Sequence, residues 1–314
     1  MTLSPDFQTE REYREFNAIN YSILKNLDTS LNSVIKPTTH STRAMNLGTG
    51  VDILITQNKD VFYERFEVHT TTPKEPPVSI QKIFLACESW DQVFDEAKAQ
   101  EYGGKWRDET IMSKLEDHKD WFELMLRARE VSIITPAEEE KIFLAATNIT
   151  SNKFLQDVFE SPLQKYYQFG IHCKVNGIVY KVLLDMMLVN EKEKKIYPFD
   201  LKTHDKSCNN YVENAFFLWR HDIQSSLYKT VLEARFPEYQ IMDFTNIVYS
   251  FSTQKAIKVD THKFYEKARK GYVRNGVIYK GWEQLTDDLL WHQEGDIWDY
   301  SREIYENNGV VVVC

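Results

Sequence analysis

The stretch from Tyr180 to His204 reads YKVLLDMMLVNEKEKKIYPFDLKTH, and it decides how the fold is interpreted. Two runs of residues that favour strands flank the polar run NEKEK at residues 190–194. We therefore predict one strand over residues 177–189, a turn, and a second strand over residues 195–203. The two strands are expected to pair as a hairpin.

Three charged residues interrupt the apolar pattern of this hairpin. Asp185 lies inside the first strand, while Asp200 and Lys202 share one face of the second, because alternate strand residues point the same way. A carboxylate in an apolar setting is costly unless it is paired or binds a metal. Two carboxylates and a lysine at the ends of adjacent strands suit Mg²⁺ or Mn²⁺ with its waters and a phosphate oxygen. The alternative is a buried Asp–Lys ion pair without chemistry.

Composition bounds the class of protein. The chain has 314 residues, 42% of them hydrophobic and 13% aromatic, which is enough for a sizeable core. A net charge of −9 argues against indiscriminate binding of nucleic acid, although a local basic groove is compatible with it. The sequence contains no run long enough to span a bilayer and no signal-peptide pattern, so we expect a cytoplasmic protein without membrane contact. The four widely spaced cysteines are expected to be reduced thiols.

The hairpin motif resembles a known signature. Asp185 followed by Asp200-Leu201-Lys202 looks like the D…(D/E)xK pattern of the PD-(D/E)XK nuclease superfamily. Gln224 and Tyr228 are four residues apart and would share one face of a helix expected over residues 211–236. They resemble the QxxxY motif of the RecB-like branch of that superfamily, which implies that they hold the DNA backbone or an end phosphate. Arg220, one turn earlier, would lie near the same face and add substrate contacts.

A third segment is similar to the exonuclease VIII-like group within this branch. Residues 48–52 read GTGVD, where the group usually has a helix beginning Gly-Thr-Ala-x-His. Asp52 stands in place of the metal-binding histidine, and a carboxylate suits Mg²⁺ better than imidazole does. Asp52 is thus a candidate metal ligand, and the alternative is an ordinary polar residue on a helix face.

Two further positions follow from the resemblance. An acidic residue ahead of the first sheet strand often assists the metal site in the family, and Glu160 occupies that place, with a surface glutamate as the alternative. A basic residue four positions before the first aspartate often lies near substrate phosphate, and Lys181 occupies it, with a solvated charge as the alternative. The resemblance also implies that the carbonyl of Leu201 binds the metal.

The resemblance implies an α/β (α+β) fold, a restriction-endonuclease-like core with a central mixed sheet flanked by helices and an N-terminal helical elaboration. We expect one nuclease domain, with a mostly helical part over residues 1–150, the catalytic sheet and QxxxY helix over residues 151–260, and a helical part over residues 261–314. Residues 61–68 are expected to form a strand. Residues 309–314 suit either a last strand or an oligomer contact.

The activity implied by the resemblance is Mg²⁺-dependent hydrolysis of duplex DNA from an end, as in phage or prophage recombination. Relatives often form rings around DNA, so a homo-oligomer and a recombination partner such as a single-strand annealing protein are expected as well. The clustered cysteines that carry an iron–sulfur cluster in some relatives are missing, so none is expected. The alternatives are an endonuclease or single-strand nuclease of the same fold, a DNA-binding protein without activity, and a structural subunit.

Overall fold

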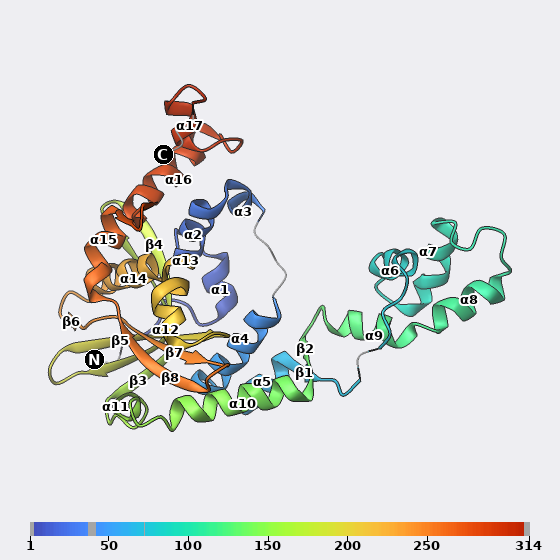
Figure 1. Ribbon diagram of the computed structural model, residues 1–314, viewed down its shortest axis with the longest axis horizontal. Helices are drawn as coiled ribbons and strands as arrows, with labels where there is room; N and C mark the ends of the chain where they lie inside the picture. The colour runs from blue at the N-terminus through green and yellow to red at the C-terminus, as the bar shows by residue number, and fades with distance from the viewer. Residues whose placement is uncertain (1–2, 37–41, 72, 311–314) are drawn as a thin grey trace. The chain divides into compact units, whose positions relative to one another are not determined.

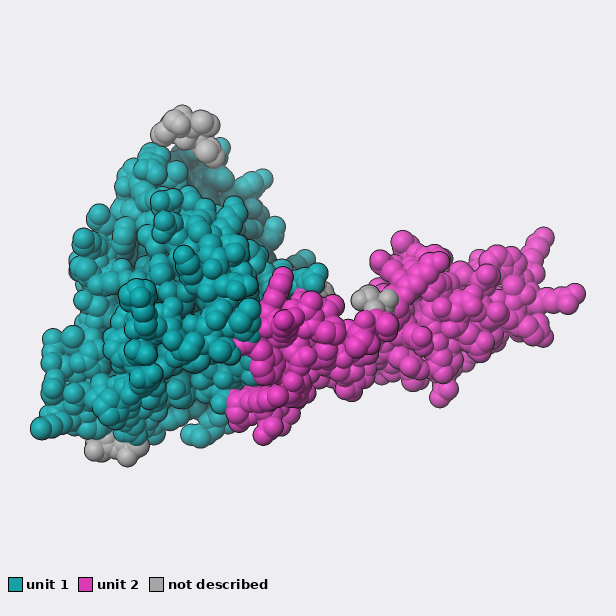
Figure 2. Space-filling view, turned by 60° about the horizontal axis from the view of Figure 1, so that its bottom comes forward, with its two compact units in different colours: residues 1–57, 144–314 teal, residues 58–143 magenta. Residues whose placement is uncertain are grey.

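The computed structural model describes residues 3–36, 42–71 and 73–310. The chain forms two compact units, one of residues 1–57 and 144–314 and the other of residues 58–143 (Figure 1 and Figure 2). The second unit is therefore an insertion in the sequence of the first. The prediction for the C-terminal tail falls largely on residues 311–314, outside the described residues.

The larger unit is built on a six-stranded mixed sheet with the order β3-β4-β5-β7-β8, and β6 pairs with β5. β3, β4 and β5 are antiparallel neighbours, β7 runs parallel to β5, and β8 is antiparallel to β7. The predicted central mixed sheet flanked by helices is thus confirmed, and so is the hairpin of residues 178–204. The strands are β3 (Gln164–Val175), β4 (Ile178–Asn190), β5 (Lys195–His204), β6 (Gln240–Ile241), β7 (Thr245–Ser250) and β8 (Lys255–Asp260).

β4 and β5 form a fork. Their ladder runs only from Asn190↔Lys195 to Met186↔Phe199, although both strands continue beyond it. One further step in that register would place Asp185 opposite Asp200. Like charges directly opposite each other destabilise a ladder, so this is where the strands are expected to part.

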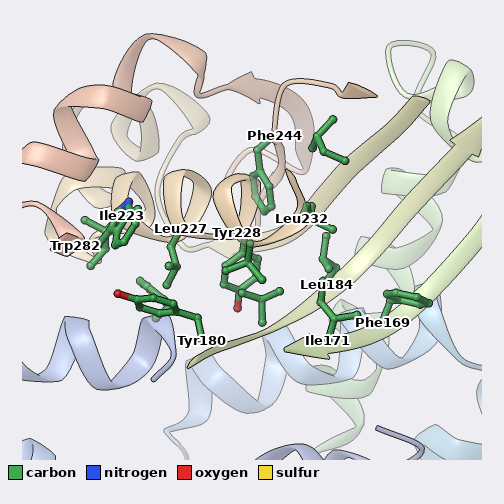
Figure 3. Close-up of a cluster of buried hydrophobic side chains, with 14 of the residues drawn as sticks. Phe169, Ile171, Tyr180, Leu184, Ile223, Leu227, Tyr228, Leu232, Phe244 and Trp282 are labelled. Atoms are coloured by element: carbon green, nitrogen blue, oxygen red, sulfur yellow. The ribbon is translucent and has the colours of Figure 1, made fainter. Parts of the chain in front are cut away.

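The long helix expected over residues 211–236 is interrupted. It consists of a π-helical turn at Tyr211–Ala215, α13 at Phe216–Leu218, and α14 at His221–Arg235. Arg220 lies between the last two, with a left-handed φ of 55°. α14 packs on β3 and β4, and its apolar side forms the main core with residues of those strands (Figure 3). Labelled members of this core include Phe169, Ile171, Tyr180, Leu184, Ile223, Leu227, Tyr228 and Trp282.

Short helices complete the larger unit. α4 packs against β4 and β5, and α16 packs on α2 and α15. A small antiparallel pair, β9 (Tyr272–Arg274) and β10 (Val277–Tyr279), precedes α16. The helices are α1 (Glu10–Glu15), α2 (Tyr21–Thr29), α3 (Leu31–Ile35), α4 (Arg43–Thr56), α11 (Gln156–Phe159), α12 (Cys208–Asn210), α15 (Tyr265–Lys270), α16 (Trp282–Gly295) and α17 (Arg302–Glu306), with a 3₁₀ turn at His262–Phe264.

The inserted unit consists mostly of helices that pack around a hydrophobic core of their own. It also contains one parallel pair of short strands. The strand expected over residues 61–68 is wrong for its first part. Asn58 caps a helix there, and Phe62 and Phe66, four residues apart, stack with their ring centroids 4.9 Å apart. The elements are α5 (Lys59–Arg65), β1 (Phe66–Val68), α6 (Val78–Leu85), a 3₁₀ turn at Trp90–Gln92, α7 (Val93–Ala99), α8 (Asp108–Glu116), α9 (Lys119–Arg127) and β2 (Ser132–Ile134), and α10 (Pro136–Thr150) contains the boundary between the units.

Candidate active site

The fork between β4 and β5 brings the hairpin's charged residues together. The Leu201 amide donates to Asp185 Oδ2 at 2.7 Å, so the aspartate side chain takes the place of a ladder partner. The Lys202 ammonium forms an ion pair with Asp200, whose side chain is only 2% exposed. The Leu201 amide therefore faces Asp185, and the expected role of its carbonyl as a metal ligand stays a prediction.

α14 reaches the same cluster through its glutamine. Gln224 Nε2 donates to Asp200 Oδ1 at 2.8 Å, within a buried environment. Tyr228 lies one turn further along the helix, buried in the core against Phe244. Burial raises the pKa of Tyr228 well above its usual value, so its hydroxyl stays protonated. The two predicted QxxxY residues therefore share a face, but only Gln224 contacts a member of the charged cluster.

Asp52 joins the cluster from α4. This helix passes close to β5 at Gly48, where an added Cβ would lie 2.9 Å from Thr203 Oγ1. Asp52 follows one turn later, and its Oδ2 accepts a hydrogen bond from Gln168 Nε2 at 2.9 Å. Burial, and then the charge of Asp200, raise the pKa of Asp52 to about 7.

Gln168 is a residue of this cluster that the sequence reasoning missed. It lies in the middle of β3 with a left-handed φ of 48°, between two residues that keep the ladder register with β4. Such a conformation is costly for a residue other than glycine and is found preferentially at functional sites. Its one sequence signal was a polar residue in an aromatic-rich strand.

Electrostatics of the cluster favour a cation. Burial, followed by the charges of Asp200 and Asp52, raises the pKa of Asp185 well above its usual range. Burial alone would lower the pKa of Lys202, but the surrounding carboxylates, Asp200 first, raise it instead. Three mutually repelling carboxylates thus share one ammonium, and a divalent cation would relieve the repulsion that remains.

One buried acceptor atom provides an independent test of fit for a metal. Within the described ranges, Asp52 Oδ1 has no hydrogen-bond partner. Unsatisfied buried acceptors are unusual and require a donor, a water or an ion. Carboxylate and amide oxygens are also the ligands that Mg²⁺ and Mn²⁺ prefer. The donor set therefore fits a hard divalent cation. Among the described residues, the three aspartates do not bring one ligand atom each within 4.8 Å of one another.

Two predicted substrate contacts have other partners. The Lys181 ammonium donates to the carbonyls of Tyr13, Arg14 and Phe16 at 2.6–3.1 Å, which uses all three of its hydrogens. Arg220 is buried between Asp28 and Asp222, with which it forms ion pairs. In the described part of the chain, neither Lys181 nor Arg220 is hydrogen-bonded to a member of the charged cluster, and both bind other groups.

The predicted acidic ligand ahead of the sheet is exposed. Glu160 caps the C-terminus of α11, and no contact between it and the charged cluster is found in the described part of the chain. A separate group, Asp243, Asp260 and His262, has ligand atoms that all lie within 4.8 Å of one another. All three residues are exposed, and Asp260 already accepts hydrogen bonds from the backbone and ring of His262.

Comparisons with known proteins give little further guidance. No family model and no curated protein matches the chain. A solved structure from Eubacterium rectale, described as a "putative exonuclease", shares 11% identity at a TM-score of 0.49, covering 100% of this chain and 96% of its own. The solved structure of SSO0001 shares 13% identity at a TM-score of 0.27, covering 56% of this chain and 69% of its own. Likenesses at this level do not establish an activity.

The described residues include no helix with both the length and the apolar character needed to cross a membrane.

Proposed function

We propose that this protein is a divalent-metal-dependent deoxyribonuclease that hydrolyses phosphodiester bonds of duplex DNA from an end. The observation that carries the proposal is the convergence of Asp185, Asp200 and Lys202 at the fork, with Gln224 fixed to Asp200. The order and spacing of these residues are those of the D…DxK and QxxxY motifs. The resemblance to phage-type recombination exonucleases supports action from an end and a role in recombination.

Asp185, Asp200 and Asp52 would hold Mg²⁺ or Mn²⁺. Such a cation lowers the pKa of a bound water and offsets the charge that develops on the phosphate. Lys202 supplies a compact positive charge beside Asp200, where it would orient the attacking water and stabilise the negative phosphate oxygens. Gln224 holds the Asp200 carboxylate in place, and Gln168 does the same for Asp52.

The test uses linear duplex DNA labelled at one end, incubated with Mg²⁺ and in parallel with EDTA. With Mg²⁺ we expect degradation from an end, seen as label released in a mononucleotide or as labelled strands that shorten stepwise. With EDTA we expect neither. Covalently closed circular duplex should be spared, and its cleavage would identify an endonuclease instead. Release of label from single-stranded DNA alone would identify a single-strand nuclease.

Lys202→Ala provides the decisive variant. We expect its cleavage rate to fall by about 100-fold or more, because one preorganised charge at a reacting group contributes that much. Binding of duplex in EDTA should persist. Lys195→Ala is the matched control, since Lys195 lies on the same strand but pairs with Glu193 near the surface. Equal cleavage by wild type and Lys202→Ala would rule out the role given to Lys202.

Loss of catalysis with retention of the fold is the remaining alternative. A protein of that kind would bind duplex DNA and show no cleavage at any concentration of Mg²⁺ or Mn²⁺. Titration of the metal against the thermal unfolding temperature separates the cases, because a functional site must stabilise the protein when it binds the cation.

A further inference from the structure

The break in the helix at Arg220 sets the direction of the residue that follows it. The left-handed conformation costs free energy for a non-glycine residue and persists only where the surroundings hold it. Here Asp28 and Asp222 hold the guanidinium, with Nε 3.2 Å from Asp222 Oδ1. α14 consequently begins at His221, directly after the break.

A chain of hydrogen bonds links Asn246 and Tyr211 to the His221 ring. Asn246 Nδ2 donates to the Tyr211 hydroxyl oxygen at 3.2 Å, and the same hydroxyl is hydrogen-bonded to His221 Nδ1 at 2.8 Å. When the hydroxyl is the donor to Nδ1, the ring hydrogen of neutral His221 lies on Nε2. Among the described residues, no hydrogen-bond partner is found for Nε2.

The connection between strands places this ring beside Lys202. The chain passes from β5 through α14 to β6 and β7, which are both parallel to β5, so α14 runs back along β5 in the opposite direction. Gln224 contacts Asp200, and His221 lies about 5 Å earlier along the helix on the same face. Lys202 lies about 7 Å beyond Asp200 along the strand. By this spacing His221 lies level with Lys202, and the charge of Lys202 acts on its ring.

Electrostatics agree with this position. Burial, and then the charges of Lys202 and Lys25, hold the pKa of His221 well below its usual value. The other groups facing the ring are Tyr211, whose hydroxyl binds it, His204, and Tyr21, whose ring centroid is 6.4 Å away. The imidazole is therefore neutral at the pH of the cell, and it can donate a hydrogen bond without adding a third positive charge.

We propose that His221 donates its Nε2 hydrogen to a non-bridging oxygen of the scissile phosphate, next to Lys202. This inference rests on the proposed nuclease function. No proton is transferred in the step, since the imidazole contributes a fixed dipole whose interaction strengthens as charge builds on the phosphate. Tyr211 and Asn246 act as positioning residues, because they select the tautomer without touching the substrate.

The test compares His221→Ala with His221→Gln, whose side-chain amide places a donor close to the position of Nε2. Cleavage of end-labelled linear duplex is measured with Mg²⁺, and duplex binding and thermal unfolding are measured in EDTA. We expect Ala to lower kcat about 10- to 100-fold with little change in KM, and Gln to recover most of that loss. Binding and unfolding should stay near wild type. His69→Ala is the control, since His69 pairs with Glu67 in the inserted unit.

Each contrary result has its own meaning. Absence of cleavage by the wild type would overturn the proposed nuclease function and this inference with it. Wild-type cleavage that is unchanged in His221→Ala, or lost equally in Ala and Gln, would overturn the inference alone. The tautomer gives a measurement besides activity: ¹⁵N NMR of the histidine rings should show His221 protonated at Nε2, and Tyr211→Phe should weaken that preference and lower kcat. Protonation at Nδ1 in the wild type would also overturn the inference.

Discussion

Asp52 shows how one side chain connects stability with function. Its pKa of about 7 lies above the ordinary value of 3.8, so the folded protein keeps a proton that the unfolded chain loses between about pH 4 and pH 7. Stability without metal should therefore fall as the pH rises through this range and then level off. A difference of one pKa unit between the folded and unfolded states corresponds to at most about 1.4 kcal/mol of stability.

Replacing Asp52 by asparagine removes this ionisation. In EDTA we expect Asp52→Asn to unfold at a higher temperature than wild type at pH 8 and at nearly the same temperature near pH 4. With Mg²⁺ the order at pH 8 should reverse, because the wild type gains a ligand that the variant lacks. Thermal unfolding at both pH values provides the measurement, and Asp205→Asn, at an exposed position, provides the control. If the variant and the wild type unfold at the same temperature at pH 8 in EDTA, the pKa of Asp52 is not raised to about 7.

Lys181 is a second residue whose chemistry can be tested by substitution. Its ammonium satisfies three carbonyls at the end of α1 and the turn that follows. Hydrogen bonds to a charged group contribute more than neutral ones, so Lys181→Met should lower the free energy of unfolding by about 2–3 kcal/mol. Chemical denaturation provides the measurement, and cleavage by the remaining folded protein should be unchanged. A large loss of DNA binding with unaltered stability would instead support the phosphate contact predicted from the sequence.

At the scale of elements, the two hairpin turns explain why the sheet could be predicted from the sequence. Asn176 and Gly177 both have positive φ, at 50° and 89°, which is the requirement of the two-residue turn that the sequence Asn-Gly predicts. β4 and β5 lie close to their expected bounds. The strand prediction at residues 61–68 failed because large residues spaced four apart, such as Phe62 and Phe66, also form one stripe along a helix.

Tertiary contacts explain what the sequence could not predict. The spacing of Asp185, Asp200 and Lys202 was sufficient to expect them at one place, because pairing within a hairpin is a local rule. Gln224 was expected near them only from the resemblance to the QxxxY motif. The left-handed Arg220 depends on Asp28, nearly two hundred residues away, and no local pattern predicts it. The strained Gln168 and the link from Asn246 to His221 have the same origin.

The turn makes a prediction about the hairpin as a unit. Gly177→Val should lower the free energy of unfolding by about 1–2 kcal/mol, because a β-branched residue is strained at a φ of 89°. The cost should appear in the unfolding midpoint and leave kcat unaltered. Nothing lies within 4 Å of an added Cβ at Gly177, so a clash with residues elsewhere in the chain does not explain this loss of stability. An unchanged midpoint would mean that the turn rearranges without cost.

At the scale of the whole molecule, charge is divided unevenly between the two units. The inserted residues 58–143 contain 12 Lys and Arg against 19 Asp and Glu, a formal net charge of −7, while the rest of the chain is close to balanced at −2. DNA binding depends on neutralising phosphates with basic side chains. The balance of charge therefore favours the larger unit as the place where DNA would bind, and the acidity of the insertion accounts for most of the chain's total charge.

Within the described part of the chain, the fork also leaves one flank of β4 without a neighbouring strand between its start and Asp185. The segment before α2 fills part of it: Ile19 exchanges backbone hydrogen bonds with Val179 and Lys181. A shortened chain beginning at Asn20 would lose that cover and offer bare amides and carbonyls to any extended peptide. Such a chain should self-associate, which light scattering would detect as dimers or larger species at concentrations where the full chain keeps its size. The fork that brings the charged cluster together is thus also a place where this fold is open to mispairing.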